Sequence, residues 1–311
     1  MKNIIDATAG VRIGQPMVHS NLTVFPLFGS LPSAADYLTL DEALEQKCAA
    51  VTEVSEGGSV PELKFVNSGE KRVFLLDGEQ LVGAKQNRVL NLSILVAGGK
   101  VIIIPVTCVE SGRWRHRSDQ FSSSASVHYA EGRARKMAQV SASMRATGRR
   151  NSDQGRVWAD ISEKSARFSV ASETSAMNDI YDKESERLQD YTTSFSTLEG
   201  QSGAVFAIDG QIVGLDLFDS AETLKKLFPK LLNSYGLDAL DRARSKRSKA
   251  EKQCMPADVE GFLKSVREAK MEEFPAVGEG VDIRFSGRDI TGAALAVDDR
   301  IVHLSAFAGG N

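Results

Sequence analysis

The sequence predicts an α+β fold: antiparallel β-sheets arranged like a sandwich, with helices packed on one side. Three observations predict this class. Short apolar runs of strand length recur between turn residues, one strongly amphipathic helix follows in the second half, and a polar helical insertion separates them at about residues 120–198. Neither end of the 311-residue chain contains a clear Pro/Gly-rich linker, so we expect a single β-rich domain over residues 1–311.

The strongest strand signals lie between Lys71 and Arg117. The apolar run Val73–Leu76 precedes Asp77-Gly78, a dipeptide that type I′ hairpin turns prefer, and a second apolar run follows. Similar turn chemistry recurs at Asp209-Gly210 and at Asp298-Asp299, each between apolar runs. The pattern therefore predicts three hairpins of one kind.

A further hairpin is expected directly after the first. Leu90–Val96 and Lys100–Val106 flank Ala97-Gly98-Gly99, where glycine readily supplies a positive φ. Val101–Ile104 is apolar at every position, which predicts a strand covered on both faces. Pro105 lacks a backbone donor and indicates an edge or a bulge at that point.

The remaining elements follow from shorter patterns. Thr39 and Glu42 have the spacing of a capping box, which predicts a short helix. In chain order, the other predicted elements are a hairpin ending in the strand Leu22–Phe28, strands at Val51–Val54 and Val60–Val66, an amphipathic helix from Leu224 to Tyr235 kinked at Pro229, a polar helix end or linker at Arg242–Lys252, a helix at Pro256–Met271 and closing strands at Val281–Leu304.

Polar residues interrupt the apolar pattern at Lys85–Arg88, and two interpretations stay open. If one strand continues through the interruption, Gln86 and Arg88 share a face with apolar neighbours, where an unpaired charge costs several kcal/mol. If the chain turns, the segment is an ordinary solvated loop. Because hydrogen-bond donors are dense beside a predicted buried sheet, we interpret the cluster as an anion site.

A basic segment follows from Ser111 to Arg150, with nine basic and two acidic residues in a chain of net charge −3. Such a run is either a solvated face or a surface that attracts phosphate. Trp114 lies between Arg113 and Arg115, and an aromatic ring beside arginine can hold a base and its phosphate. The Ser122–Ser124 run suggests a flexible loop.

The segment Ser126–Phe195 is expected to be helical, although apolar residues are sparse in it. Such helices bury little surface alone, so we expect them to pack on the sheet by a narrow stripe or on a second copy of the chain. A homodimer through these polar helices is therefore one expected assembly. Sustained heptads are absent from the sequence, which disfavours a coiled coil.

Familiar chemical signatures are missing from the sequence. It contains none of the nucleotide-binding glycine motifs, zinc-protease motifs or nucleophile-elbow motifs, and its four histidines lack ligand spacing. We therefore expect no metal and no cofactor. Cys108 is a candidate nucleophile, although a core cysteine is the more common role. Glu79 and Glu110 are the candidate acid and base. The chain lacks an apolar run of membrane-spanning length and a signal-peptide core, so we expect a cytoplasmic protein with no membrane partner.

Three segments resemble the ARG and rhodanese-phosphatase-superfamily-associated protein family. They are LDGEQLVGAKQNRVLN (Leu76–Asn91), PVTCVESGRW (Pro105–Trp114) and GLDLFDSAETLKKLFPKLLNSYGLDAL (Gly214–Leu240), and the likeness runs from about Leu22 to the C-terminus. The resemblance implies association with ADP-ribosylglycohydrolases and phosphatase-like proteins, and hence a role around ADP-ribose or related nucleotides.

Two functions are open at this point. The first is binding, with or without hydrolysis, of a phosphorylated nucleoside or an ADP-ribose-like ligand. The second is a non-enzymatic scaffold that binds a protein or nucleic acid through basic helices. Under the first function, the ligand-binding residues are Lys85, Gln86, Asn87, Arg88, Arg113, Trp114 and Arg115, and the proton-transfer residues are Glu79 and Glu110.

Overall fold

The computed structural model describes residues 2–29, 35–245 and 253–309. Eight helices and 18 strands lie within these ranges, and almost all neighbouring strands are antiparallel, so the α+β class is confirmed. The basic run predicted at Arg242–Lys252 falls partly outside the described residues. Within the described ranges, no helix is both long enough and apolar enough to cross a lipid bilayer.

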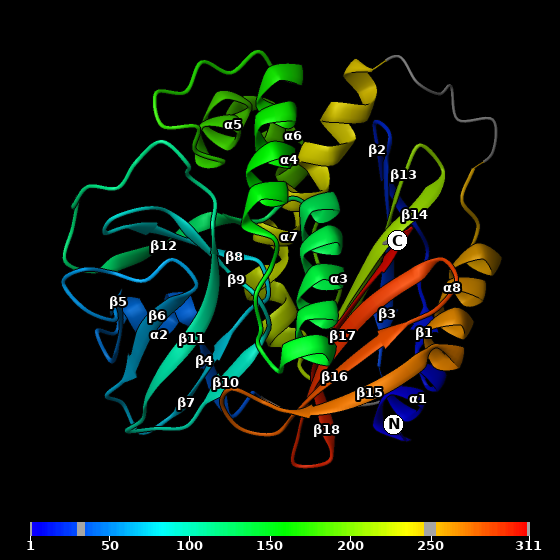
Figure 1. The fold of residues 1–311 in the computed structure, drawn as a ribbon. Coiled ribbons are helices and arrows are strands. Elements are labelled where there is room, and N and C mark those ends of the chain that lie inside the picture. Colours follow the sequence, from blue (N-terminus) through cyan, green and yellow to red (C-terminus); the bar gives the residue numbers. More distant parts are fainter. Residues whose placement is uncertain (1, 30–34, 246–252, 310–311) are drawn as a thin grey trace.

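The largest sheet joins the two ends of the chain (Figure 1). Its strands, in spatial order, are β1 (Arg12–Ile13), β3 (Leu22–Phe28), β13 (Gly203–Ile208), β14 (Gln211–Phe218), β18 (Arg300–Ala308), β17 (Ile290–Val297), β16 (Val281–Ser286) and β15 (Lys270–Pro275), with β2 (Met17–His19) paired to β3. Successive residues of β13 enter different cores: Ala204 and Phe206 join one, and Val205 and Ala207 the other. Alternation along the strand therefore separates two buried faces.

Helices cover both faces of this sheet (Figure 1). On the central face lie α3 (Ala130–Thr147), α4 (Gln154–Arg167), α5 (Asn178–Lys183), α6 (Ser185–Ser194) and α7 (Ala221–Arg244). On the outer face lie α1 (Lys2–Ala9) and α8 (Pro256–Glu268). The predicted polar helical segment is thus α3 to α6, and it connects β12 to β13. The helix α7 continues through Pro229.

The first half of the chain forms two smaller sheets around a third core. The six-stranded sheet has the order β12 (Phe121–Val127), β8 (Glu79–Gly83), β9 (Arg88–Leu90), β11 (Val101–Cys108), β6 (Glu62–Asn67) and β5 (Ala49–Glu53). The three-stranded sheet has the order β10 (Ile94–Val96), β7 (Arg72–Leu75) and β4 (Tyr37–Thr39), and α2 (Leu40–Glu45) follows β4. The capping box predicted for α2 is confirmed, because the Thr39 hydroxyl accepts from the Glu42 N–H and the Glu42 carboxylate accepts from the Thr39 N–H.

Two of the three predicted aspartate-containing hairpins are confirmed and one is wrong. Asp209-Gly210 joins β13 to β14 with φ values of 51° and 73°, and Asp298-Asp299 joins β17 to β18 with 49° and 62°. The strands flanking Asp77-Gly78 instead enter different sheets: β7 pairs with β10 and β4, and β8 with β12 and β9. Only Gly78 has a positive φ there, 81°, as in a type II turn. The Asp77 carboxylate is buried and bonded to the Lys136 ammonium, so a tertiary contact determines this turn.

The predicted pairing of Leu90–Val96 with Lys100–Val106 is also wrong over most of its length. The strand β10 pairs with β7, while β11 pairs first with β6 and then, beyond Pro105, with β9. The predicted irregularity at Pro105 is therefore the point at which β11 changes partner. Val101 and Ile103 are 60% and 46% exposed, so one face of β11 is open and the expected double coverage is wrong. Ser122–Ser124 form part of strand β12 rather than a loop.

Candidate functional site

The polar interruption in the first half is a buried turn. The strand β8 ends at Gly83 and β9 begins at Arg88, so the chain turns as one of the two interpretations expected. The turn is nevertheless not solvated, because Gln86, Asn87 and Arg88 are all buried. Each buried polar group therefore requires a partner.

Glu110 and Arg113 are partners of each other in this cluster. Arg113 Nε and Nη2 donate to the two carboxylate oxygens at 2.8 and 2.7 Å, and the Asn87 N–H donates to Glu110 Oε2 at 2.9 Å. Arg113 also donates to the carbonyl oxygens of Gly83 and Ala84. Burial by itself raises the pKa of Glu110, but the Arg113 contacts and the Asn87 N–H outweigh it and lower the pKa. An ionised, fully bonded pair of this kind joins segments of the chain and has little capacity left for a ligand.

Arg88 differs from Arg113 because it has no carboxylate within ion-pair distance among the described residues. Its side chain is 0% exposed, and Nη1 donates to Gln86 Oε1 at 3.0 Å. Nε and Nη2 lack a hydrogen-bond partner within the described part of the chain. Burial lowers the pKa of Arg88, as expected when a cation is removed from water.

The structure brings two predicted ligand residues close to the ring of a third, Trp114. Lys85 Nζ lies 5.6 Å and Arg88 Cζ 5.8 Å from the ring centre of Trp114, whose side chain is 49% exposed. The Lys85 ammonium also donates to the carbonyl oxygen of Glu56. Arg115, the other residue flanking Trp114 in the prediction, is exposed. The polar turn and the tryptophan therefore lie next to each other.

The other predicted chemical residues have structural partners. Glu79 is buried, and its carboxylate lies 2.6 Å from the ammonium of Lys230 in α7. The thiol of Cys108 is buried 3.1 Å from Gln86 Oε1, and burial raises its pKa. A thiol whose pKa is raised is a poor nucleophile at neutral pH, which favours a core role for Cys108.

Acidic residues, some nearby and some from distant segments, neutralise much of the basic segment. Arg133 Nη2 lies 2.7 Å from Asp216, the Lys136 ammonium bonds to Asp77, and Arg135 bonds to Glu131. Arg113 pairs with Glu110, and Arg145 with Glu272. The positive charge that the sequence concentrates here is therefore only partly available at the surface.

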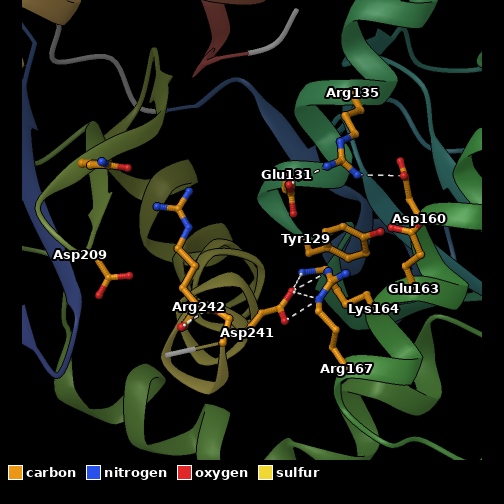
Figure 2. Close-up of a pocket in the computed structure, with 12 residues that line it drawn as sticks. Tyr129, Glu131, Arg135, Asp160, Glu163, Lys164, Arg167, Asp209, Asp241 and Arg242 are labelled. Carbon is orange, nitrogen blue, oxygen red and sulfur yellow. Dashed lines mark hydrogen bonds and ion pairs between the residues drawn. The ribbon is translucent and has the colours of Figure 1, made fainter. Parts of the chain in front are cut away.

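A large polar cleft lies elsewhere, between three helices and the tip of the β13–β14 hairpin (Figure 2). Its volume is about 520 Å³, and an adjoining cavity of about 480 Å³ shares part of the same lining. The charged residues that line it are Glu131 and Arg135 of α3, Asp160, Glu163, Lys164 and Arg167 of α4, Asp209 at the hairpin tip, and Asp241 and Arg242 of α7. The volumes of the cleft and of the adjoining cavity lie in the range of small-molecule binding sites.

The floor of the cleft is a buried ion-pair network between α4 and α7. Lys164 Nζ bonds to Asp238 Oδ1 at 2.6 Å and to Asp241 Oδ2 at 2.8 Å, and Arg167 bonds to Asp241 at 2.8 Å. Burial alone lowers the pKa of Lys164, but the two carboxylates outweigh it and raise the pKa. Lys164 Nζ also lies 4.3 Å from the ring centre of Tyr129. The network fixes the helices that form the walls.

Several groups on the walls have spare hydrogen-bonding capacity. Within the described residues, Arg242 and Glu163 have no ion pair, and Arg242 makes one long hydrogen bond, 3.4 Å, to the Ile208 carbonyl. The Tyr129 hydroxyl has no partner in the same part of the chain. Figure 2 shows Arg242 and Asp209 on one side of the cleft, and Tyr129 and Glu163 on the other. The cleft can therefore offer a cation and carboxylates to a ligand, whereas the Tyr129 hydroxyl is buried.

Reasoning from the sequence missed this cleft. Lys164 and Arg167 are three residues apart, as are Asp238 and Asp241, so each pair lies on one face of its helix. These matched spacings were the available signal. The sequence does not show that the two helices face each other.

Comparison with known proteins identifies one similarity. The model of the ARG and Rhodanese-Phosphatase-superfamily-associated Protein domain matches residues 10–307. No curated protein and no solved structure matches the chain significantly.

Proposed function

The chain belongs to the ARG and Rhodanese-Phosphatase-superfamily-associated Protein domain family, and from this premise we propose that it binds a phosphorylated nucleoside or an ADP-ribose-like ligand in the cleft of Figure 2. One observation carries the proposal: unpaired groups of both signs face a cavity large enough for such a ligand. Near Trp114, by contrast, the guanidinium of Arg88, unpaired within the described residues, is fully buried.

The chemistry of the walls supports this ligand class. Arg242 can form charge-assisted hydrogen bonds with a phosphate. Glu163 and Asp209 are carboxylates, which accept hydrogen bonds from sugar hydroxyls. A diphosphate without hydroxyl groups would meet these acids unfavourably, and a neutral sugar would leave Arg242 unused. A ligand that combines both kinds of group uses the whole lining.

Hydrolysis of this ligand is a separate part of the proposal. The predicted acid and base, Glu79 and Glu110, lie in ion pairs outside the cleft lining. In the cleft, Glu163 is the exposed carboxylate with spare capacity, and it is the residue to test as a proton acceptor. Binding can therefore be measured independently of turnover.

The alternative function, a scaffold that binds nucleic acid or protein through a basic helical surface, loses part of its basis. Arg133 and Lys136 are buried in ion pairs, and Arg135 and Arg145 bond to carboxylates. Exposed Arg115, which has no ion pair among the described residues, still contributes positive charge. Salt-dependent binding to nucleic acid is the result that would favour this alternative.

A thermal-shift screen with ADP-ribose, NAD, AMP and ADP tests the proposal. We expect a ligand-dependent rise in Tm that Arg242→Ala reduces and that the exposed-residue control Arg115→Ala retains. Loss of the response in Arg88→Ala but not in Arg242→Ala would move the site to the cluster around Trp114. Incubation with each stabilising ligand, followed by chromatography, then shows whether Glu163→Gln stops turnover.

A further inference from the structure

A serine, a histidine and an aspartate from three distant segments form a hydrogen-bonded chain outside the cleft. Ser93 lies between β9 and β10, His303 in β18 and Asp216 in β14. Ser93 Oγ lies 2.8 Å from His303 Nδ1, and His303 Nε2 lies 3.2 Å from Asp216 Oδ1. The same order of groups activates a serine nucleophile on several unrelated folds.

The aspartate end of this chain is fixed and ionised. Asp216 is fully buried, and Arg133 donates to both of its oxygens, at 3.1 and 2.7 Å. The Tyr235 hydroxyl donates to Oδ2 at 2.9 Å. Burial alone raises the pKa of Asp216, but Arg133 and His303 outweigh it and lower the pKa to about 2.

An ionised carboxylate only accepts hydrogen bonds, so the proton of neutral His303 belongs on Nε2. Nδ1 then has a free lone pair directed at Ser93 Oγ. The ring is held by stacking on Phe218, with 4.6 Å between ring centres, and by an edge contact with Phe74 at 5.9 Å. The imidazole is therefore oriented as a general base toward the serine hydroxyl.

The serine end opens on a small cavity. Ser93 is half-buried, whereas His303 and Asp216 are buried. The cavity, of about 10 Å³, is lined by Ser93, His303 and Arg284, and that space corresponds to roughly one water molecule. The cavity therefore has room for little more than the carbonyl oxygen of a small acyl group, and the alcohol part of an ester stays outside it, on the half-buried side of Ser93.

The same cavity holds a donor for developing negative charge. Arg284 is buried and pairs with Asp282 through Nε and Nη2, each at 2.8 Å. Its Nη1 has no hydrogen-bond partner within the described residues. A fixed donor beside a nucleophile is the arrangement that stabilises a tetrahedral oxyanion.

We propose that Ser93, His303 and Asp216 form a reactive site, separate from the cleft, that hydrolyses short-chain carboxylic esters, with Arg284 stabilising the oxyanion. Ser93 Oγ attacks the carbonyl carbon while its proton moves to His303 Nδ1. The tetrahedral intermediate expels the alcohol, which takes that proton, and leaves an acyl-serine. Water, deprotonated by His303, then attacks the acyl carbon, and Ser93 Oγ leaves and regains the proton. Asp216 is a positioning residue.

Covalent labelling tests the proposal without any variant. The full chain is treated with a fluorophosphonate probe, digested and analysed by mass spectrometry. We expect one adduct on the peptide containing Ser93, lost in Ser93→Ala and retained in Ser126→Ala. Ser126 is a buried serine whose hydroxyl bonds to Gln80 rather than to a histidine. Absence of the Ser93 adduct from folded wild-type protein overturns the proposal.

Hydrolysis of p-nitrophenyl acetate supplies the second readout. We expect His303→Gln to lower the rate about 100-fold or more, since general-base catalysis is typically that large. Asp216→Asn should lower kcat and leave KM unchanged, whereas a merely structural role would not separate the two constants. An unchanged rate in folded Ser93→Ala would overturn the proposal, whatever the ligand screen on the cleft shows.

Discussion

The cluster around Arg113 and the cleft of Figure 2 are both rich in charge, but they use it differently. In the cluster, Glu110 receives three hydrogen bonds from Arg113 and the Asn87 N–H, and the polar atoms are enclosed. In the cleft, the floor network and Arg135, which pairs with Glu131 and Asp160, are saturated, whereas Arg242 and Glu163 on the walls lack ion pairs within the described residues. A dense charge pattern in the sequence therefore does not distinguish a structural network from a binding site.

The difference has a physical origin. A charge that is removed from water must be paired, and breaking such a pair leaves its partner unsatisfied in a medium of low polarity. A charge that faces a cleft is still hydrated, so its removal changes the stability of the protein little. We therefore expect substitutions in the cluster to change stability and substitutions in the cleft to change ligand binding.

The largest expected effect is on stability, in the cluster. Glu110→Ala leaves the Arg113 guanidinium buried without its carboxylate, and we expect the free energy of unfolding to fall by about 3–5 kcal/mol. Urea denaturation measures the change. The matched cleft variant Glu163→Ala should change it by less than about 0.5 kcal/mol. Equal losses in the two variants would remove the distinction between the regions.

The next effect is on ligand response, in the cleft. At a ligand concentration of about 100 Kd, binding adds about 2.7 kcal/mol to stability. A tenfold weaker Kd in Arg242→Ala should reduce that gain to about 1.4 kcal/mol. Denaturation with and without the stabilising nucleotide checks this, with Arg115→Ala as the control. A full gain in Arg242→Ala would exclude Arg242 from the site.

A pH dependence is expected from both regions. The pKa values of Glu110 and Asp241 are lowered in the folded state. Burial alone would raise both values, but the hydrogen bonds and charge of Arg113 outweigh burial at Glu110. Those of Arg167 and Lys164 outweigh it at Asp241. A carboxyl group whose pKa is lowered by folding stabilises the folded protein at any pH above its ordinary pKa, which is 4.5 for Glu110 and 3.8 for Asp241. This stabilisation is lost as the pH falls from that value through the lowered pKa of the folded state.

Urea midpoints measured from pH 6 to pH 3 should therefore decline below about pH 4.5. The variant Glu110→Gln, which cannot titrate at that position, should start lower and decline less. A parallel decline in wild type and Glu110→Gln would show that Glu110 contributes none of the acid sensitivity.

The smallest expected effect is at Arg88. Because this buried guanidinium lacks a carboxylate among the described residues, Arg88→Met removes a charge that is poorly compensated, and we expect a stability change within about 1 kcal/mol. Arg113→Met, which breaks a buried ion pair, should cost several kcal/mol. A large loss in Arg88→Met would indicate that an anion pairs with Arg88 in solution, as the sequence interpretation expected.

The sequence located part of the candidate chemistry. It indicated that the polar turn and Trp114 belong together, and Lys85 and Arg88 do lie near that ring. It did not indicate that Arg113 and Glu110 satisfy each other, because two charges three residues apart pair or diverge according to the backbone between them. The cleft joins segments more than 70 residues apart in sequence through the Lys164–Asp238 bond, and the hydrogen bonds of His303 to Ser93 and Asp216 also join distant segments. No pattern within a few neighbouring residues shows that such segments meet.

The sequence by itself determined those elements that are stabilised by contacts between residues a few positions apart. Thr39 caps α2 because its partner is three positions away, and Asp209-Gly210 forms a hairpin because both residues tolerate positive φ. Tertiary structure decided the turn at Asp77-Gly78, which has the same dipeptide. There, Lys136 of a later helix binds the aspartate, and the two flanking strands pair in different sheets, so the strand partners rather than the dipeptide decide the connection.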